Sequence, residues 1–135
     1  AMTERQSVSS GTPWEPKMGY CRAVRVDRHV YVSGTTATDE NGNLVGPGDY
    51  AAQTDYILKK IERALTELGA SIKDVVRTRV YVADATQWEG VASVHGAVFG
   101  DIRPANTLVE ISAFVGEGYL VEIEVDAVIG AGDAL

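Results

Sequence analysis

The sequence predicts an α+β protein in which two helices cover one face of a mixed β-sheet. Two stretches carry apolar residues at helical spacing, and the stretches around them alternate apolar and polar residues as strands do. The resulting order is strand, strand, helix, strand, helix, strand, strand. Two helices can cover only one face of such a sheet, so we expect the other face to lie against another copy of the chain.

The N-terminal part begins with a polar segment and continues into two strands. Residues 1–18 are expected to be partly flexible, with Trp14 packed against the body of the protein. Residues 22–26 and 30–33 alternate as strands around a short turn. The second strand ends in small, hydrogen-bonding residues that begin at Ser33 and Gly34.

Residues 49–68 carry the clearest helix pattern. Asp49 is placed to cap the first turn, and Gly69 stands where a glycine commonly follows a helix. The apolar residues at helical spacing are Ile57, Ile61, Leu65 and Leu68. This stripe predicts that the helix packs on the sheet.

A third strand and a second helix follow. Residues 75–82 alternate valines and a threonine with Arg77, Arg79 and Tyr81. Asp84, with Gln87 three residues later, resembles a capping box and predicts a helix that runs to about Phe99. The helix face expected to be buried carries Trp88, Val91, His95, Val98 and Phe99.

The C-terminal part is predicted to be a β-hairpin, with strands at about 106–115 and 119–129. The connector Gly116-Glu117-Gly118 is short and rich in glycine, as hairpin loops are. One face of each strand is apolar. Carboxylates that lie close together repel one another, so the other face requires cations, water or a ligand, unless it is simply solvated. That face carries Asn106, Leu108 and Glu110 on the first strand and Glu122, Glu124 and Asp126 on the second.

Size and charge exclude several classes of function. The chain has 135 residues, which suits a single domain over 1–135. Its net charge of −7 argues against nucleic acid as a partner, because proteins that bind phosphates present basic surfaces. Cys21 is the only cysteine, and no apolar run is long enough to span a membrane, so a cytoplasmic location is expected. The two histidines do not form a metal-ligand cluster.

The residues from Gly19 to Ile129 resemble the Rid family, the reactive intermediate deaminases, also called YjgF-like proteins. The resemblance rests on short motifs that occur in the family's order and spacing. They are Gly19-Tyr20, Val32-Ser33-Gly34, Gly69-Ala70-Ser71, Asp74-Val75-Val76, Phe99-Gly100, Arg103-Pro104-Ala105, Val109-Glu110 and Val121-Glu122-Ile123-Glu124.

The resemblance implies a chorismate-mutase-like fold and a homotrimer with ligand sites in clefts between subunits. Typical members hydrolyse reactive enamines and imines to 2-keto acids and ammonia, and they use no metal or other cofactor. A tyrosine, a Ser-Gly pair, a glutamate and an arginine form the family's site. Tyr20, Ser33, Gly34 and Glu122 match these positions.

The family's arginine is missing, because Asn106 occupies its position, and Leu108 stands where relatives often have cysteine. A guanidinium grips a carboxylate through charge-assisted bonds worth roughly 1.5–3 kcal/mol, against about 1 kcal/mol for a neutral bond. We therefore expect Asn106 and Leu108 to line the site and the substrate to differ from the usual 2-imino acids.

Arg22 is the candidate for the missing cation. In an extended chain its side chain would lie about 6.5 Å from that of Tyr20, on the same side. Either Arg22 binds a substrate carboxylate, or it pairs with Glu110 or Glu122. Glu122 is either a general base that positions water or an ordinary surface carboxylate.

Two functions follow from these residues. One is cofactor-free hydrolysis of a small enamine or imine, with Tyr20, Arg22 and Glu122 as catalytic residues and with Ser33, Gly34, Asn106 and Leu108 as ligand-binding residues. The alternative is a non-catalytic trimer that binds a small metabolite. In either case we expect the ligand to carry a carboxylate. Ribonuclease activity, which has been attached to some relatives, fits the acidic charge least.

Overall fold

A computed structural model describes residues 3–135 and contains one six-stranded sheet with two long helices. The strands are β1 (Arg5–Val8), β2 (Ala23–Val26), β3 (His29–Thr36), β4 (Val75–Val82), β5 (Ala105–Glu110) and β6 (Val121–Val128). The helices are α1 (Trp14–Met18), α2 (Tyr50–Glu67) and α3 (Trp88–Phe99). Single 3-10 turns cover Ile72–Asp74, Ala85–Gln87 and Ala131–Ala134.

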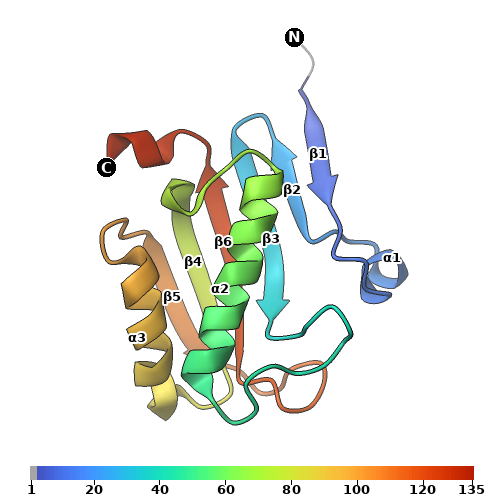
Figure 1. Ribbon diagram of the computed structural model, residues 1–135, viewed down its shortest axis with the longest axis vertical. Helices are drawn as coiled ribbons and strands as arrows, with labels where there is room; N and C mark the ends of the chain where they lie inside the picture. Colours follow the sequence, from blue (N-terminus) through green and yellow to red (C-terminus); the bar gives the residue numbers. More distant parts are fainter. Residues whose placement is uncertain (1–2) are drawn as a thin grey trace.

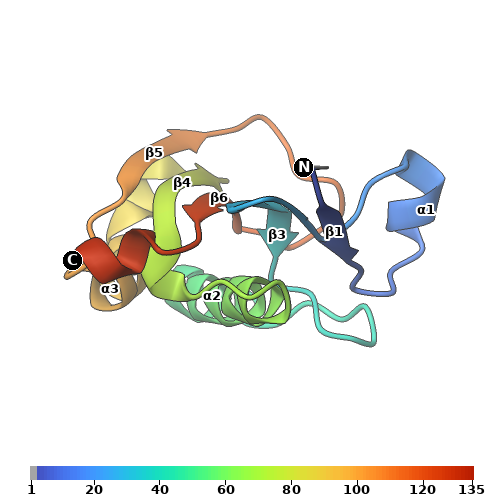
Figure 2. The same ribbon diagram turned by 90° about the horizontal axis from the view of Figure 1, so that it is seen from above.

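The predicted α+β fold is confirmed. The sheet order is β1-β2-β3-β6-β4-β5, and only β4 and β5 run parallel to each other. Figures 1 and 2 show α2 and α3 side by side on one face of the sheet, while no helix within residues 3–135 covers the other face. α1 lies beyond β1, at the opposite end of the molecule from α3.

The core lies between α2 and the sheet. The side chains of Ile57, Ile61 and Leu65 on α2 are fully buried, and they face alternate residues of the strands, including Ile123 and Val125. The predicted stripe of α2 is therefore the buried one. Asp49 caps this helix as predicted, since its carboxylate accepts a hydrogen bond from the backbone N–H of Ala52.

The predicted C-terminal hairpin is wrong. β5 and β6 are not partners, because β4 lies between them and pairs with both. β5 ends at Glu110, and the segment 111–120 crosses past the end of β4 to reach β6 (Figure 1). Alternation identified both strands, but it carries no information on which strand pairs with which.

The two faces of β5 are also the reverse of the prediction. Leu108 packs against the core, whereas Val109 is 42% exposed. The register explains this result, because Leu108 pairs with Val80, a residue of β4 that faces the helices. Asn106 and Glu110 therefore share the helix-covered side with Leu108, away from the acidic residues of β6.

The N-terminal segment differs from the prediction as well. Residues 5–8 form β1 and pair with β2, and residues 14–18 form α1. Trp14 is 57% exposed rather than packed. Residues 1 and 2 of the predicted flexible segment lie outside the described residues.

Trp88 is likewise 51% exposed, although its helix face was expected to be buried. Asp84 caps the 3-10 turn that precedes α3, so the helix begins at Trp88.

Candidate functional site

Five of the predicted site residues lie together where the pairing of β3 with β6 changes register. The register of β3 against β6 shifts between Val32 and Thr35, which places Ser33 and Gly34 in a bulge. Bulges redirect side chains and are common beside active sites. We call Tyr20, Arg22, Ser33, Gly34 and Glu122 the bulge cluster.

Glu122 lies directly against the backbone of the bulge. A Cβ atom built on Gly34 would stand 2.7 Å from a carboxylate oxygen of Glu122, which is closer than real Cβ atoms come. A side chain at this position would require the end of the Glu122 side chain to move, so glycine allows the carboxylate to lie against the bulge. The hydroxyl of Ser33 is turned elsewhere and donates a hydrogen bond of 2.8 Å to the carbonyl of Cys21.

Arg22 joins the bulge to Tyr20. Its Nη2 donates a hydrogen bond of 2.6 Å to the carbonyl of Gly34, and its guanidinium lies 5.9 Å from the centre of the Tyr20 ring. The buried Nε of Arg22 has no hydrogen-bond partner within residues 3–135. Part of the guanidinium is thus committed to the backbone, and part retains free hydrogen-bonding capacity.

Tyr20 is positioned by the end of α1. Gly19 ends this helix in the left-handed region, with φ 84°, and the N–H of Tyr20 bonds to the carbonyl of Glu15. The ring is 37% exposed.

Glu122 is the carboxylate of its row that has no hydrogen-bond partner among the described residues. The three acids of β6 share one face of the sheet. Glu124 accepts a hydrogen bond from the hydroxyl of Tyr81, and Asp126 forms an ion pair of 3.3 Å with Arg79. No ion pair joins Glu122 to Arg22 in the part of the chain that the structure describes, although Arg22 is near enough to influence its titration.

Burial raises the pKa of Glu122 above that of a free glutamate, the positive charge of Arg22 lowers it, and the negative charge of Glu124 raises it again. The balance is a raised pKa. A carboxyl group of this kind exchanges protons more readily near neutral pH than an ordinary glutamate does, which suits general acid–base chemistry.

Asn106 and Leu108 do not join the bulge cluster within one chain. They line a cavity of about 510 Å³ on the helix-covered side, which we call the α3 cavity. α3 contributes Trp88, His95 and two small residues, and β4 contributes Val80. Glu110 is also remote from Arg22, because its carboxylate accepts a hydrogen bond from the N–H of Ala85, so the predicted Arg22–Glu110 pair does not exist.

Two polar residues of this region were not among the predicted site residues. The side chain of Thr78 is fully buried, and its hydroxyl lies 2.9 Å from Nε2 of His95 and 2.9 Å from Nδ2 of Asn106. Burial lowers the pKa of His95, so the ring is neutral at physiological pH. The signal in the sequence was a threonine among the inward-facing valines of β4.

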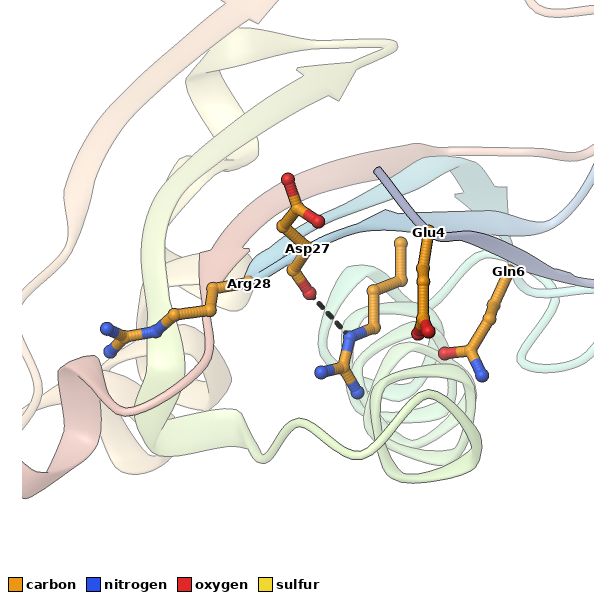
Figure 3. Close-up of a pocket in the computed structure, with 5 residues that line it drawn as sticks. Glu4, Gln6, Asp27 and Arg28 are labelled. Carbon is orange, nitrogen blue, oxygen red and sulfur yellow. Dashed lines mark hydrogen bonds between the residues drawn. The ribbon is translucent and has the colours of Figure 1, made fainter. Parts of the chain in front are cut away.

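A second hollow, of about 320 Å³, lies beside β1 and the turn between β2 and β3 (Figure 3). It is polar, but its arginines already bind backbone carbonyls. Arg25 donates to the carbonyls of Asp27 and Leu68, and Arg28 donates twice to that of Ile129. Figure 3 shows Arg28 pointing away from Glu4 and Gln6. This hollow therefore has the contacts of a structural brace.

Two kinds of feature are absent from residues 3–135. No group of three or more His, Cys, Asp or Glu side chains is arranged to hold a metal ion. Within the same range, none of the helices has both the length and the apolar character needed to cross a membrane.

The fold and the bulge cluster define a small α+β protein of the YjgF type. The family model described as Endoribonuclease L-PSP matches residues 12–129, and the chain therefore belongs to this family, the YjgF or Rid family. The predicted family membership is thus confirmed.

Relatives and solved structures agree with this assignment. The 3-aminoacrylate deaminase RutC of Acinetobacter baylyi is 36% identical over 113 residues, which cover 84% of this chain and 88% of the relative. The uncharacterized protein SCO2049 of Streptomyces coelicolor is 38% identical over 127 residues, 94% of each chain. The crystal structure of Rv2704 from Mycobacterium tuberculosis, a member of the YjgF/YER057c/UK114 family, superposes with a TM-score of 0.85 at 46% identity and covers 93% of this chain and 100% of its own.

Proposed function

We propose that this chain hydrolyses a small enamine or imine metabolite to a carbonyl compound and ammonia, without a cofactor. The observation that carries the proposal is Glu122, a carboxylate without a hydrogen-bond partner among the described residues and with a raised pKa, held against the bulge beside Arg22. The naming of a similar protein as a 3-aminoacrylate deaminase supports the same reaction class.

In the proposed reaction, the enamine first becomes an imine as its carbon gains a proton and its nitrogen loses one. Glu122 then removes a proton from a water molecule as the water oxygen attacks the imine carbon. The proton held by Glu122 passes to the nitrogen and gives a carbinolamine. A second proton then moves from the new hydroxyl group to the nitrogen, and the carbon–nitrogen bond breaks as the carbonyl forms and ammonia leaves. The net change consumes one water molecule and leaves Glu122 as it began.

Arg22 and Tyr20 would bind the substrate. The guanidinium keeps unused N–H groups after bonding to Gly34, so it is the cation of the bulge cluster that can attract a substrate carboxylate. Tyr20 offers an exposed hydroxyl beside it. The Ser33–Gly34 bulge is expected to supply further backbone groups to the substrate.

We further propose that the sites lie in clefts between the subunits of a homotrimer, to which each chain contributes a single domain. The bulge cluster and the α3 cavity lie on opposite faces of one sheet, so a site that uses both needs two chains. The uncovered face also exposes Tyr31 and Val109, at 46% and 42%, which favours its burial against a partner.

A coupled assay tests the proposal. Imines released by a pyridoxal-phosphate enzyme are supplied in situ, and keto acid formation is measured above the uncatalysed rate. Turnover that depends on Glu122 supports hydrolysis. Because Asn106 replaces the family's arginine, we expect low rates on simple 2-imino acids compared with an arginine-bearing relative assayed in parallel.

The same substitution favours a second candidate, a trimer that binds a small metabolite without turning it over. Saturable ligand binding together with no acceleration on any imine would support this candidate and refute hydrolysis. The description of the family names an endoribonuclease. The net charge of −7 argues against ribonuclease activity, because binding of nucleic acid relies on positive charge that neutralises phosphates.

A further inference from the structure

The α3 cavity has a single polar corner, at Asn106 and His95. The rest of its lining is apolar or small, with Val80 and Leu108 on the sheet and the ring of Trp88 on the helix. No lysine or arginine stands among the described residues that line it. A Cβ atom built on Gly96 would meet no heavy atom within 4 Å, so the helix side is open. The volume of about 510 Å³ is within the range of small-molecule sites.

A chain of two hydrogen bonds fixes the polar corner. Asn106 Nδ2 donates to the hydroxyl oxygen of Thr78, at 2.9 Å. That hydroxyl has one proton of its own, and the nearby acceptor is Nε2 of His95, at 2.9 Å. With this direction of the hydrogen bond, His95, whose pKa is lowered by burial, is neutral and carries its proton on Nδ1. Its ring packs at 4.6 Å against Phe99.

We call these two hydrogen bonds the relay, and their direction decides which atom of the Asn106 amide is left to bind a ligand. With Nδ2 engaged, Oδ1 remains, and no donor reaches it from the residues that the structure describes. Oδ1 is a hydrogen-bond acceptor with partial negative charge. It binds N–H or O–H groups and disfavours a carboxylate, whereas a guanidinium at the same position would do the opposite.

We propose that the α3 cavity receives an uncharged part of the ligand, which has an apolar body and an N–H or O–H donor. Thr78 and His95 are positioning residues in this site, because they set the preference for a donor through the orientation of Asn106. The inference rests on the proposed function, in which the cavity holds the substituent of the substrate and Arg22 of another chain takes the carboxylate. Simple 2-imino acids lack such a substituent, which accounts for the low rates expected on them.

The test is a binding titration of Arg22→Ala, in which the cation expected to hold a carboxylate is removed, with phenylacetamide, phenylacetate and methyl phenylacetate, three compounds that share a body and differ in the terminal group. We expect the amide to bind at least about tenfold more tightly than the carboxylate, the scale of one hydrogen bond gained rather than opposed. The ester, which has no donor, should also bind more weakly than the amide.

Thr78→Val separates positioning from simple packing. Valine keeps the branched shape but breaks the relay, so Asn106 can turn its Nδ2 to the ligand and the preference for the amide should fall below about threefold. Thr107→Val, the same change on the neighbouring exposed position of β5, is the matched control and should leave the preference unchanged. Asn106→Arg should reverse the preference toward phenylacetate.

Nitrogen NMR of His95 gives a readout that is independent of any ligand. In the wild type the ring proton of His95 should lie on Nδ1 alone. In Thr78→Val it should be distributed between Nδ1 and Nε2. Tighter binding of phenylacetate than of phenylacetamide to Arg22→Ala, or an amide preference that survives when Thr78→Val is added, would overturn the inference. A proton on Nε2 of His95 in the wild type, or no saturable binding of any probe, would overturn it as well. Failure to accelerate imine hydrolysis, with the amide preference and its loss in Thr78→Val intact, would refute the proposed function alone.

Discussion

Replacing Glu122 by glutamine should remove turnover and stabilise the fold at the same time. The carboxylate is partly buried, has no hydrogen-bond partner among residues 3–135, and its pKa is raised by burial. A raised pKa in the folded state means that ionisation opposes folding at neutral pH. Glutamine has nearly the same shape and no charge, so Glu122→Gln removes this opposition.

The expected magnitudes follow from the surroundings of the carboxylate. The attraction of Arg22 and the screening of this partly exposed carboxylate by solvent offset part of the burial cost. We therefore expect a gain in unfolding free energy of at most about 1 kcal/mol, or at most roughly 3 °C in Tm for a chain of this size. Loss of a general base should lower kcat about 10²- to 10⁴-fold. The gain in stability should fade below the ordinary glutamate pKa of 4.5, because the carboxyl group is then protonated in both states.

Glu124→Gln is the matched control. It makes the same change two residues along β6, but Glu124 accepts a hydrogen bond from Tyr81. This variant should keep turnover within a few-fold and lose about 1 kcal/mol of stability. The assays are imine hydrolysis and thermal unfolding at pH 7 and pH 4, with the oligomeric mass checked for each variant. A Glu122→Gln protein that is less stable than the wild type, or that still turns over substrate, would refute the reasoning.

Three further predictions concern other parts of the molecule. Arg22→Ala should weaken binding of a carboxylate ligand about tenfold or more, and Arg22→Lys should recover only part of the loss, because an ammonium lacks the planar fork; equal affinities in a titration of the three proteins would make Arg22 structural. Light scattering coupled to gel filtration should give the mass of a trimer at micromolar concentration, and a monomer mass would contradict clefts between subunits. Burial, with repulsion from Arg22 and Arg63, lowers the pKa of Lys60 from 10.5 to about 8. Between pH 8 and pH 10.5 the unfolded chain therefore binds more protons than the folded chain, so the contribution of Lys60 to stability should rise with pH over this range. Urea unfolding of wild type and Lys60→Met at pH 7.5, 9 and 10 checks this, and a wild-type advantage that falls with pH would contradict it.

The sequence predicts α2 and β4 well because their patterns are long and local. The caps and stripe of α2 are all encoded within about twenty residues. β1 and α1 could not be predicted in the same way, because β1 has four residues, mostly exposed, and α1 has five. Their signals are too short and too polar for periodicity to detect.

The pairing of β5 is a different kind of failure. Its partner β4 lies more than twenty residues earlier in the chain, and a helix separates them. Nothing in the alternation of residues 105–110 favours β4 over β6, and the glycines at 116 and 118 imitate a hairpin loop. The wrong partner then placed Asn106 and Leu108 on the wrong face.

Sequence reasoning was more successful for the bulge cluster than for the α3 cavity. Motif matches placed Tyr20, Ser33, Gly34 and Glu122 together, and the structure brings them into one region along with Arg22. The relay through Thr78 and His95 could not be predicted, because it depends on how α3 lies against β4. Its residues looked like ordinary core positions.

The central position of β6 has a consequence for how the nascent chain folds. β1, β2 and β3 form one ladder and β4 and β5 form another, and only β6 joins them. Until β6 has been synthesised, β3 and β4 each present an open edge of unpaired backbone N–H and C=O groups, of the kind through which chains aggregate. The sheet can therefore close only in a late, cooperative step, when the last of its strands inserts between two partners that were made much earlier.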